Sequence, residues 1–242
     1  MTREHWLSLD EPAAELSSLR WGLIVFAVCF ACWHVMTNLL INEAPIWQNA
    51  IHFGGFAFLA SVVFPSRLFG RSNLAFDLIY GGAVAAAACW VVAAESRIYE
   101  ETLAITGQSW QFNIIDWTAG LLLIVAALDF SRRVSGWVIP FLIVVSISYI
   151  LFLGEYLPGV FRTASLPLDD VLFRTIYNDE GLFGILANIS SSNIALFMIF
   201  GGFLVVSGAS DFVIEVSKVV AGRIRGGAAF VAVLSSALTG TI

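Results

Sequence analysis

Long stretches without a charged side chain divide this sequence and limit what it can fold into. An α-helix rises about 1.5 Å per residue, so about 20 apolar residues cross the roughly 30 Å hydrocarbon core of a bilayer. Six long stretches contain no Asp, Glu, Lys or Arg: Trp21–Ile41, Ala44–Pro65, Leu78–Ala94, Val134–Gly154, Gly181–Ser210 and Gly226–Ile242. A seventh charge-free stretch, Trp117–Leu128, is shorter. We therefore predict an all-α, polytopic integral membrane protein with about seven transmembrane helices.

The composition agrees with a lipid environment. Hydrophobic residues make up 59% of the 242 positions and charged residues 12%, whereas soluble domains hold roughly 45–50% and 25%. The sequence holds no basic patch suited to nucleic acid, so we expect no such partner. About twenty mostly polar residues precede the first apolar stretch, unlike the start of a cleavable signal peptide, so that stretch should remain as the first span.

The distribution of Lys and Arg predicts the orientation, because these residues are retained on the cytoplasmic side. A cytoplasmic N-terminus and seven crossings place nine of the twelve inside: Arg3, Arg20, Arg67, Arg71, Arg132, Arg133, Lys218, Arg223 and Arg225. Arg97, Arg162 and Arg174 fall outside, with most of the acidic residues. The opposite orientation reverses this distribution, so we predict that the N-terminus is cytoplasmic.

Two segments between the apolar stretches have the spacing of amphipathic helices. In Leu168–Tyr177, apolar residues recur at intervals of three or four, which predicts a short helix lying along the outer interface. In Asp211–Arg225, apolar residues share one side and cations follow towards the end. This pattern suits an amphipathic helix on the anionic cytoplasmic surface.

Few residues have a pattern typical of a metal, redox or proton-transfer site. Cys29 and Cys32 form a CxxC within the first stretch, but a metal or redox site needs further ligands, so packing is the expected role. His34 and His52 lie within the first two stretches, where a hydrogen bond to a neighbouring helix is expected and a proton relay is the alternative.

Asp129 precedes Arg132 and Arg133 by three and four residues, which predicts a structural ion pair at the cytoplasmic end of a helix. The sequence has no nucleophile–base set, HExxH motif or phosphate-binding glycine loop, so we do not predict an enzyme. An unrelated channel or membrane enzyme is disfavoured for the same reason.

The second half of the chain carries a series of specific motifs. They are Asp129–Pro140, Gly154–Gly159, Tyr177–Gly184, Phe200–Phe212, Ala221–Gly227 and Ser235–Ile242. In this order they closely resemble the fused permease of TRAP (tripartite ATP-independent periplasmic) transporters, of the TAXI-associated type. The resemblance is specific from about residue 129, and the first four stretches are similar mainly in layout. The sequence departs from the family's usual pattern at two places. Residues 185–188 read Ile-Leu-Ala-Asn instead of a Pro-Leu-Gly-like segment, and two valines at 205–206 replace a charged pair that is common in the family.

The resemblance implies a division of the chain. Residues 1–20 would form a cytoplasmic segment, 21–133 a four-helix scaffold like the small (DctQ-like) subunit, and 134–242 the beginning of the large (DctM-like) transport subunit. In the family, a Ser-Gly-Ser-rich hairpin tip and most of the large subunit follow. We therefore expect a truncated chain that is inactive without the remainder of the large subunit.

The resemblance also implies a function. Such permeases lie in the bacterial inner membrane and import small organic acids with a sodium (sometimes proton) gradient. They receive substrate from a periplasmic binding protein, and they need no cofactor apart from the coupling ion. The alternative is a membrane scaffold or assembly protein without transport activity of its own.

The last residues of the chain are the candidates for a substrate or ion pathway. Transporters of this kind bind substrate near the middle of the membrane, where broken helices expose backbone groups to ions. The candidates are Ser235, Ser236, Thr239, Gly240 and Thr241. They offer hydroxyls and a flexible backbone for a partial sodium site, whereas the alternative is that these small residues only allow close helix packing.

Overall fold

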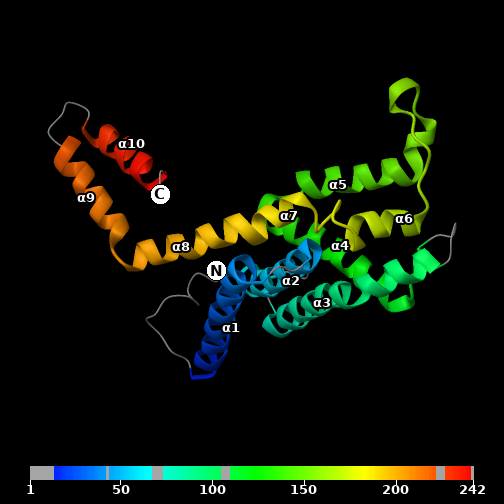
Figure 1. The fold of residues 1–242 in the computed structure, drawn as a ribbon, viewed down its shortest axis with the longest axis horizontal. Helices are drawn as coiled ribbons and strands as arrows, with labels where there is room; N and C mark the ends of the chain where they lie inside the picture. The colour runs from blue at the N-terminus through cyan, green and yellow to red at the C-terminus, as the bar shows by residue number, and fades with distance from the viewer. Residues whose placement is uncertain (1–13, 42–43, 67–72, 105–109, 222–226, 241–242) are drawn as a thin grey trace. The chain divides into compact units, whose positions relative to one another are not determined.

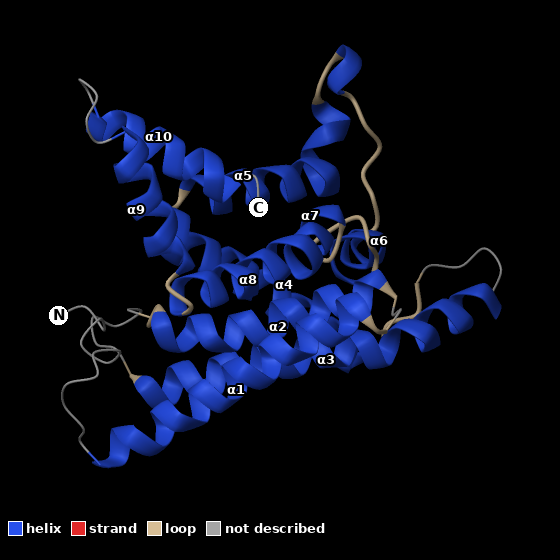
Figure 2. Cartoon of the chain, turned by 60° about the vertical axis from the view of Figure 1, so that its left-hand side comes forward, coloured by secondary structure: helices blue, strands red, loops and turns tan. Residues whose placement is uncertain are grey.

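Helices form nearly all of the chain that the structure describes. The computed structural model describes residues 14–41, 44–66, 73–104, 110–221 and 227–240, and these residues contain no strand (Figures 1 and 2). The chain forms two compact units, Met1–Ser191 and Ser192–Ile242, which are described separately below. The prediction of an all-α fold is confirmed.

Five of the longer helices belong wholly to the first unit. They are α1 (Ala14–Leu39), α2 (Pro45–Val63), α3 (Leu74–Ala104), α4 (Ile114–Ser135) and α5 (Val138–Ser148), which continues through the short turns η2 (Tyr149–Leu153) and η3 (Gly154–Tyr156). Further short helices follow: η4 (Gly159–Phe161), α6 (Leu168–Leu172), η5 (Phe173–Tyr177), α7 (Ile185–Ile189) and η6 (Ser190–Ile194). The second unit holds α8 (Ala195–Val206), α9 (Ala209–Ala221) and α10 (Gly227–Gly240).

Among the described residues, six helical segments are long and apolar enough to cross a bilayer. They are Leu19–Leu39, Pro45–Val63, Leu74–Glu101, Ile114–Ser135, Val138–Tyr156 and Ile185–Val206. The seventh predicted span differs, because α10 has 14 residues and extends only about 21 Å. Among the described residues, six of the predicted spans are thus helices of spanning length, and the remaining one is a shorter apolar helix.

Three helix boundaries differ from the charge-free stretches. The helix α1 begins at Ala14, inside the segment predicted to precede the first span. The helix α3 runs to Ala104, well beyond the charge-free stretch that ends at Ala94. Ion pairing stabilises this extension, because Arg97 binds the buried Asp116 at 2.7 Å and Glu101, one turn later, at 3.0 Å. The short stretch 117–128 lies within a 22-residue helix, α4, whose charges are confined to its two ends.

Small residues bring α2 and α3 into close contact. A Cβ added at Gly54 would lie 2.8 Å from Ala88 Cβ and 3.2 Å from Ala85 Cα. At Gly81 it would lie 2.2 Å from Ser61 Oγ. Lipid tails are as apolar as the helices, so close backbone approach, and not water exclusion, holds spans together. The pair α2–α3 therefore forms the tightly packed centre of the first unit.

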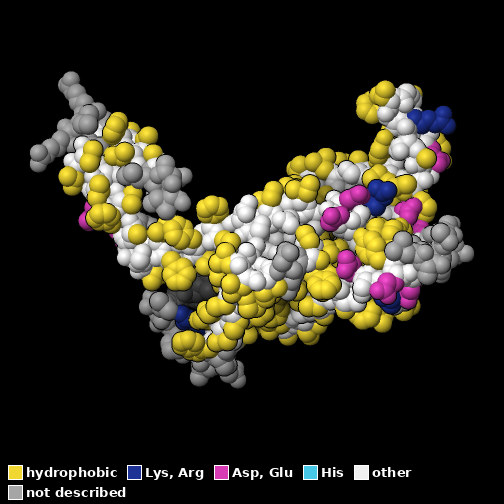
Figure 3. Space-filling model, in the orientation of Figure 1, with side chains coloured by type: hydrophobic (Ala, Val, Ile, Leu, Met, Phe, Trp, Pro, Cys, Tyr) yellow, Lys and Arg dark blue, Asp and Glu magenta, His cyan; other side chains and the backbone are white. Residues whose placement is uncertain are grey.

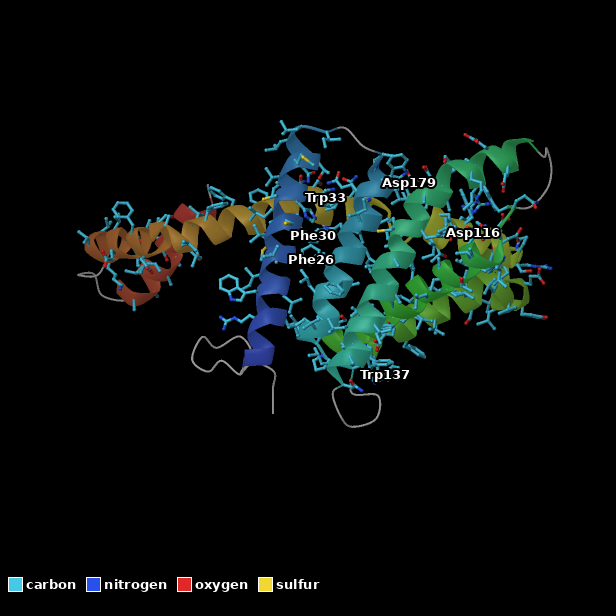
Figure 4. All side chains as sticks on the ribbon, turned by 90° about the horizontal axis from the view of Figure 1, so that it is seen from below. Phe26, Phe30, Trp33, Asp116, Trp137 and Asp179 are labelled. Carbon is cyan, nitrogen blue, oxygen red and sulfur yellow. The ribbon has the colours of Figure 1, made fainter. Side chains whose placement is uncertain are left out.

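Polar contacts join the helix ends of the first unit at both sides. At the end predicted to face the cytoplasm (the inner end), Asp77 accepts from Ser66 N at 2.9 Å, and Arg133 donates to Phe64 O at 2.7 Å. At the opposite (outer) end, Trp47 Nε1 donates to Glu95 at 2.8 Å. Figure 4 shows Asp179 towards the outer end of the first unit and Trp137 towards its inner end.

The segment Leu168–Tyr177 is helical, as predicted, but its apolar side packs on protein. Ile176 is fully buried, and the Phe173 ring stacks on Trp110 with ring centroids 3.4 Å apart. Tyr177 donates a 2.8 Å hydrogen bond to Asp116 O. The predicted interfacial helix is thus part of the core at the outer ends of α3 and α4.

In the second unit, α9 contacts both α8 and α10. The turn between α8 and α9 places Gly208 at φ +75°, a conformation that glycine adopts most readily. The predicted amphipathic helix is present as α9 as far as Ala221, and Arg223 and Arg225 lie outside the described residues. Its apolar side is exposed: Phe212 is 67% exposed and Val219 82%. Such exposure suits a helix whose apolar side faces lipid.

Candidate functional site

A group of uncharged polar side chains lies inside the spans of the first unit. We call it the outer polar cluster, and it comprises His34, Asn38, Gln48, Asn49, His52, Ser190 and Ser191. These residues come from the last turns of α1, the first turns of α2 and the π turn η6. In lipid each polar group needs an internal partner, so these helices are joined where their hydrogen-bonding groups meet.

Two histidines form the deepest part of this cluster. His34 Nδ1 lies 2.8 Å from Phe30 O, and His34 Nε2 lies 2.7 Å from His52 Nδ1. A carbonyl only accepts, so in the neutral pair His34 Nδ1 carries hydrogen and His34 Nε2 accepts from His52. His52 Nε2 then accepts from the Ser190 hydroxyl at 3.0 Å. The interhelical hydrogen bond predicted for these histidines is confirmed.

The same geometry bears on the alternative of a proton relay. A proton entering through Ser190 could pass from His52 to His34, but the chain of contacts then ends at the peptide carbonyl of Phe30. A peptide oxygen cannot carry the proton onward at neutral pH. Among the described residues the pair therefore favours a fixed connection between α1 and α2 over a path through the membrane.

Amide side chains fix the π turn η6 to α1 and α2. Asn38 Nδ2 donates to Ser191 O at 3.1 Å, and Gln48 Nε2 donates to Asn38 Oδ1 at 2.9 Å. Asn49 is 1% exposed, donates to Phe183 O at 2.8 Å and accepts from Ser191 Oγ at 2.7 Å. Irregular helical turns of this kind often occur at functional sites, and here the side chains hold the turn in place.

A buried carboxylate holds the outer ends of α3 and α4. Asp116 is fully buried, and both its oxygens lie 2.7 Å from Arg97 Nη2. It also accepts from Trp90 Nε1 at 2.9 Å and completes a capping box with Asn113. Burial, followed by the nearby Asp116 charge, raises the pKa of Tyr177 well above its ordinary value, so its hydroxyl stays protonated as a donor.

The ion pair predicted at the end of α4 is present. Asp129 contacts Arg132 at 2.8 Å and also pairs with Arg133. Arg133 is nearly buried, and its guanidinium lies over the Tyr80 and Phe130 rings at 5.5 and 5.1 Å. Arg132 is 29% exposed and lies 5.4 Å from the Trp137 ring centroid. One carboxylate thus faces two cations, which leaves a net positive charge on this group of three side chains.

The predicted pathway residues lie in or beyond α10. Ser235 Oγ donates to Ala232 O at 3.2 Å, and Ser236 is exposed. Thr239 and Gly240 occupy the last turn of α10, and Thr241 lies outside the described residues. These residues belong to the second unit, whereas the outer polar cluster belongs to the first.

Sequence reasoning missed most of the outer polar cluster and the Arg97–Asp116 pair. Gln48, Asn49 and His52 recur at three and four residues, which is the spacing of one helix face and could have indicated a polar contact. The Asn113-x-x-Asp116 capping box was also visible in the sequence. No local pattern connects Arg97 to Asp116 or Asn49 to Ser191, because these contacts depend on how the helices pack.

The helices and these sites define a class of protein: a polytopic α-helical membrane protein with uncharged polar contacts inside its spans and charges at their ends. Residues 120–242 match the family described as Tripartite ATP-independent periplasmic transporter, DctM component. The match covers just over half of the chain, and the protein belongs to this family of TRAP transporter permeases. Comparison with curated proteins gave no match, and comparison with solved structures gave none either.

Proposed function

We propose that this chain works in a secondary active importer of small carboxylates, driven by a sodium or proton gradient. Its partners would be a periplasmic substrate-binding protein and other permease subunits. The family match over 120–242 carries the proposal, because that family consists of TRAP transporter components. The match does not favour the alternative of a scaffold without transport activity. We place the protein in the bacterial inner membrane.

The TAXI-associated fused arrangement is the form of the proposal that best fits the chain. Its first three spans lie before the matched region, which begins within the fourth, and such a layout is expected if a scaffold like the small subunit is joined to the large subunit. Close α2–α3 packing and the outer polar cluster support a rigid role for this part. The boundary that the sequence suggests, 133/134, stays a prediction.

The outer end of the first unit suits a soluble periplasmic partner. Acidic side chains gather around α6 and the end of α3 (Figure 3). Glu101, Asp179 and Glu180 are exposed there. A binding protein would meet this acidic end, and complementary charge would speed its association.

Uptake of labelled carboxylates into proteoliposomes tests the proposed function. The chain, together with the remainder of the large subunit, would be reconstituted with the binding protein and a panel of labelled mono- and dicarboxylates, with an inward sodium gradient, a proton gradient or neither. We expect uptake above that of protein-free vesicles that requires both the binding protein and one gradient. Uptake equal to that of protein-free vesicles in every arm would contradict the proposal.

Two serines provide a matched test of the pathway residues. Ser235 on α10 and Ser146 on α5 each donate to a carbonyl of the preceding turn, at 3.2 and 2.9 Å. If Ser235 contributes a hydroxyl to the pathway, Ser235→Ala lowers the rate of uptake or raises the sodium concentration needed, whereas Ser146→Ala leaves both unchanged. Equal effects of the two substitutions would assign Ser235 to packing alone.

A further inference from the structure

An apolar groove runs between α4 and α5 close to the turn that joins them. Its volume is about 400 Å³, within the range of small-molecule sites. The lining residues are Val125, Leu128, Asp129 and Arg132 on α4, and Trp137, Pro140, Phe141 and Val144 on α5. All of them belong to the first unit.

The apolar walls of the groove face outward. Phe141 is 65% exposed, Val125 55% and Val144 48%. These residues lie in the segments Ile114–Ser135 and Val138–Tyr156, both of spanning length and composition. Side chains exposed on such segments contact hydrocarbon chains, so the groove opens towards lipid.

Positive charge lies at the inner end of the groove. Asp129 is shared by two arginines, and Arg133 is 6% exposed and also bound to Phe64 O. Arg132 therefore presents the surplus charge, through a guanidinium with five N–H donors of which Asp129 engages one nitrogen, Nη2. The Trp137 ring, 72% exposed, lies beside it and carries an N–H suited to the headgroup layer.

We propose that this groove binds one anionic phospholipid of the inner leaflet. An acyl chain lies along Val125, Phe141 and Val144, and the phosphate contacts Arg132 and Trp137 Nε1. The charge is complementary, because the α4–α5 turn carries one more cation than anion among these residues and the cytoplasmic leaflet is anionic. An Arg–phosphate contact is charge-assisted and therefore stronger than a neutral one. The inference is independent of the proposed transport function.

Native mass spectrometry of the full chain tests the proposal. The protein would be reconstituted in nanodiscs of phosphatidylcholine with a minor share of phosphatidylglycerol, and the lipids retained after release would be identified by mass. We expect one phosphatidylglycerol per chain, enriched about fivefold or more over its share of the nanodisc. Equal retention of the two lipids, or a lipid-free dimer, would overturn the proposal.

Two neighbouring valines provide the matched variants. Val144 lines the groove, whereas Val145 is similarly exposed (42%) but does not line it. Val144→Phe fills the groove and should abolish lipid retention, and Val145→Phe should leave it unchanged. Arg132→Gln should remove the preference for phosphatidylglycerol, while Arg132→Lys should keep most of it.

Two further measurements separate lipid binding at the groove from misfolding of a variant and from binding of phosphate alone. Circular dichroism establishes that each variant retains its helices, and the wild-type enrichment stands even if a variant misfolds. Inorganic phosphate added in excess should not displace the lipid, because it has no acyl chain. Complete displacement by phosphate, or retention unaffected by Val144→Phe in a folded protein, would contradict the site.

Discussion

At the scale of single residues, burial separates the ion pairs that hold this protein together from those that do not. Arg97 contacts two carboxylates, Asp116 at 2.7 Å and Glu101 at 3.0 Å. The Asp116 side chain is 0% exposed and that of Glu101 is 47%. Removing one partner from a buried pair leaves a charge without compensation, whereas an exposed pair is screened by water.

Two substitutions test this difference. Asp116→Asn should lower the free energy of unfolding by about 1.5–3 kcal/mol, because the buried carboxylate and its charge-assisted hydrogen bonds to Arg97 are lost. Glu101→Gln should lower it by at most about 1 kcal/mol. The measurement is SDS titration of the protein in mixed micelles, followed by circular dichroism. Equal losses for both variants would show that Asp116 is not the main partner of Arg97.

At the scale of elements, the packing of α2 on α3 depends on residues without bulk. A Cβ at Gly81 would meet Ser61 Oγ at 2.2 Å and Phe58 Cα at 3.2 Å, whereas one at Gly82 meets nothing within 4 Å. Ser61 is fully buried, so it has little room to move. Adjacent glycines in one helix therefore have different roles: Gly81 allows α3 to approach α2 closely, whereas Gly82 lies away from this contact.

This difference predicts opposite results for the same chemical change. Gly81→Ala should lower the free energy of unfolding by about 1–3 kcal/mol, as overpacking does. Gly82→Ala should leave it unchanged or raise it by up to about 1 kcal/mol, because alanine favours helix. The SDS titration described above measures both. A neutral Gly81→Ala would mean that α2 and α3 are not packed as closely as the structure shows.

The sequence predicted the helices and contacts that depend on residues close together in the chain. Charge-free stretches predicted where the six helices of spanning length lie, although the stretch at 117–128 was shorter than its helix. Spacing at three and four residues predicted the helix at Leu168–Tyr177 and the pairing of Asp129 with its arginines. The end of α3 could not be read in this way, because Arg97 is stabilised by Asp116, 19 positions later. The outer polar cluster was missed for the same reason: Asn49 meets Ser191 only when α2 and η6 pack together.

At the scale of the whole molecule, both polar ends of the first unit agree with one orientation. Arg132, Arg133 and the start of the loop after α2 meet at the inner end, whereas Glu101, Asp179 and Glu180 are exposed at the outer end. A cytoplasmic N-terminus places the arginine-rich end in the cytosol, as the retention of cations requires. The same orientation places the proposed lipid phosphate and the binding protein on opposite sides of the membrane.

Labelling of single cysteines in intact cells tests this central claim most directly. In a variant whose Cys29, Cys32 and Cys89 are replaced by alanine, one cysteine is introduced at Asp179 or at Ser135, both exposed. A membrane-impermeant maleimide that reaches the periplasm should label the cysteine at 179 in intact cells and the cysteine at 135 only after lysis. Labelling of 135 but not of 179 in intact cells, or of both, would contradict the account.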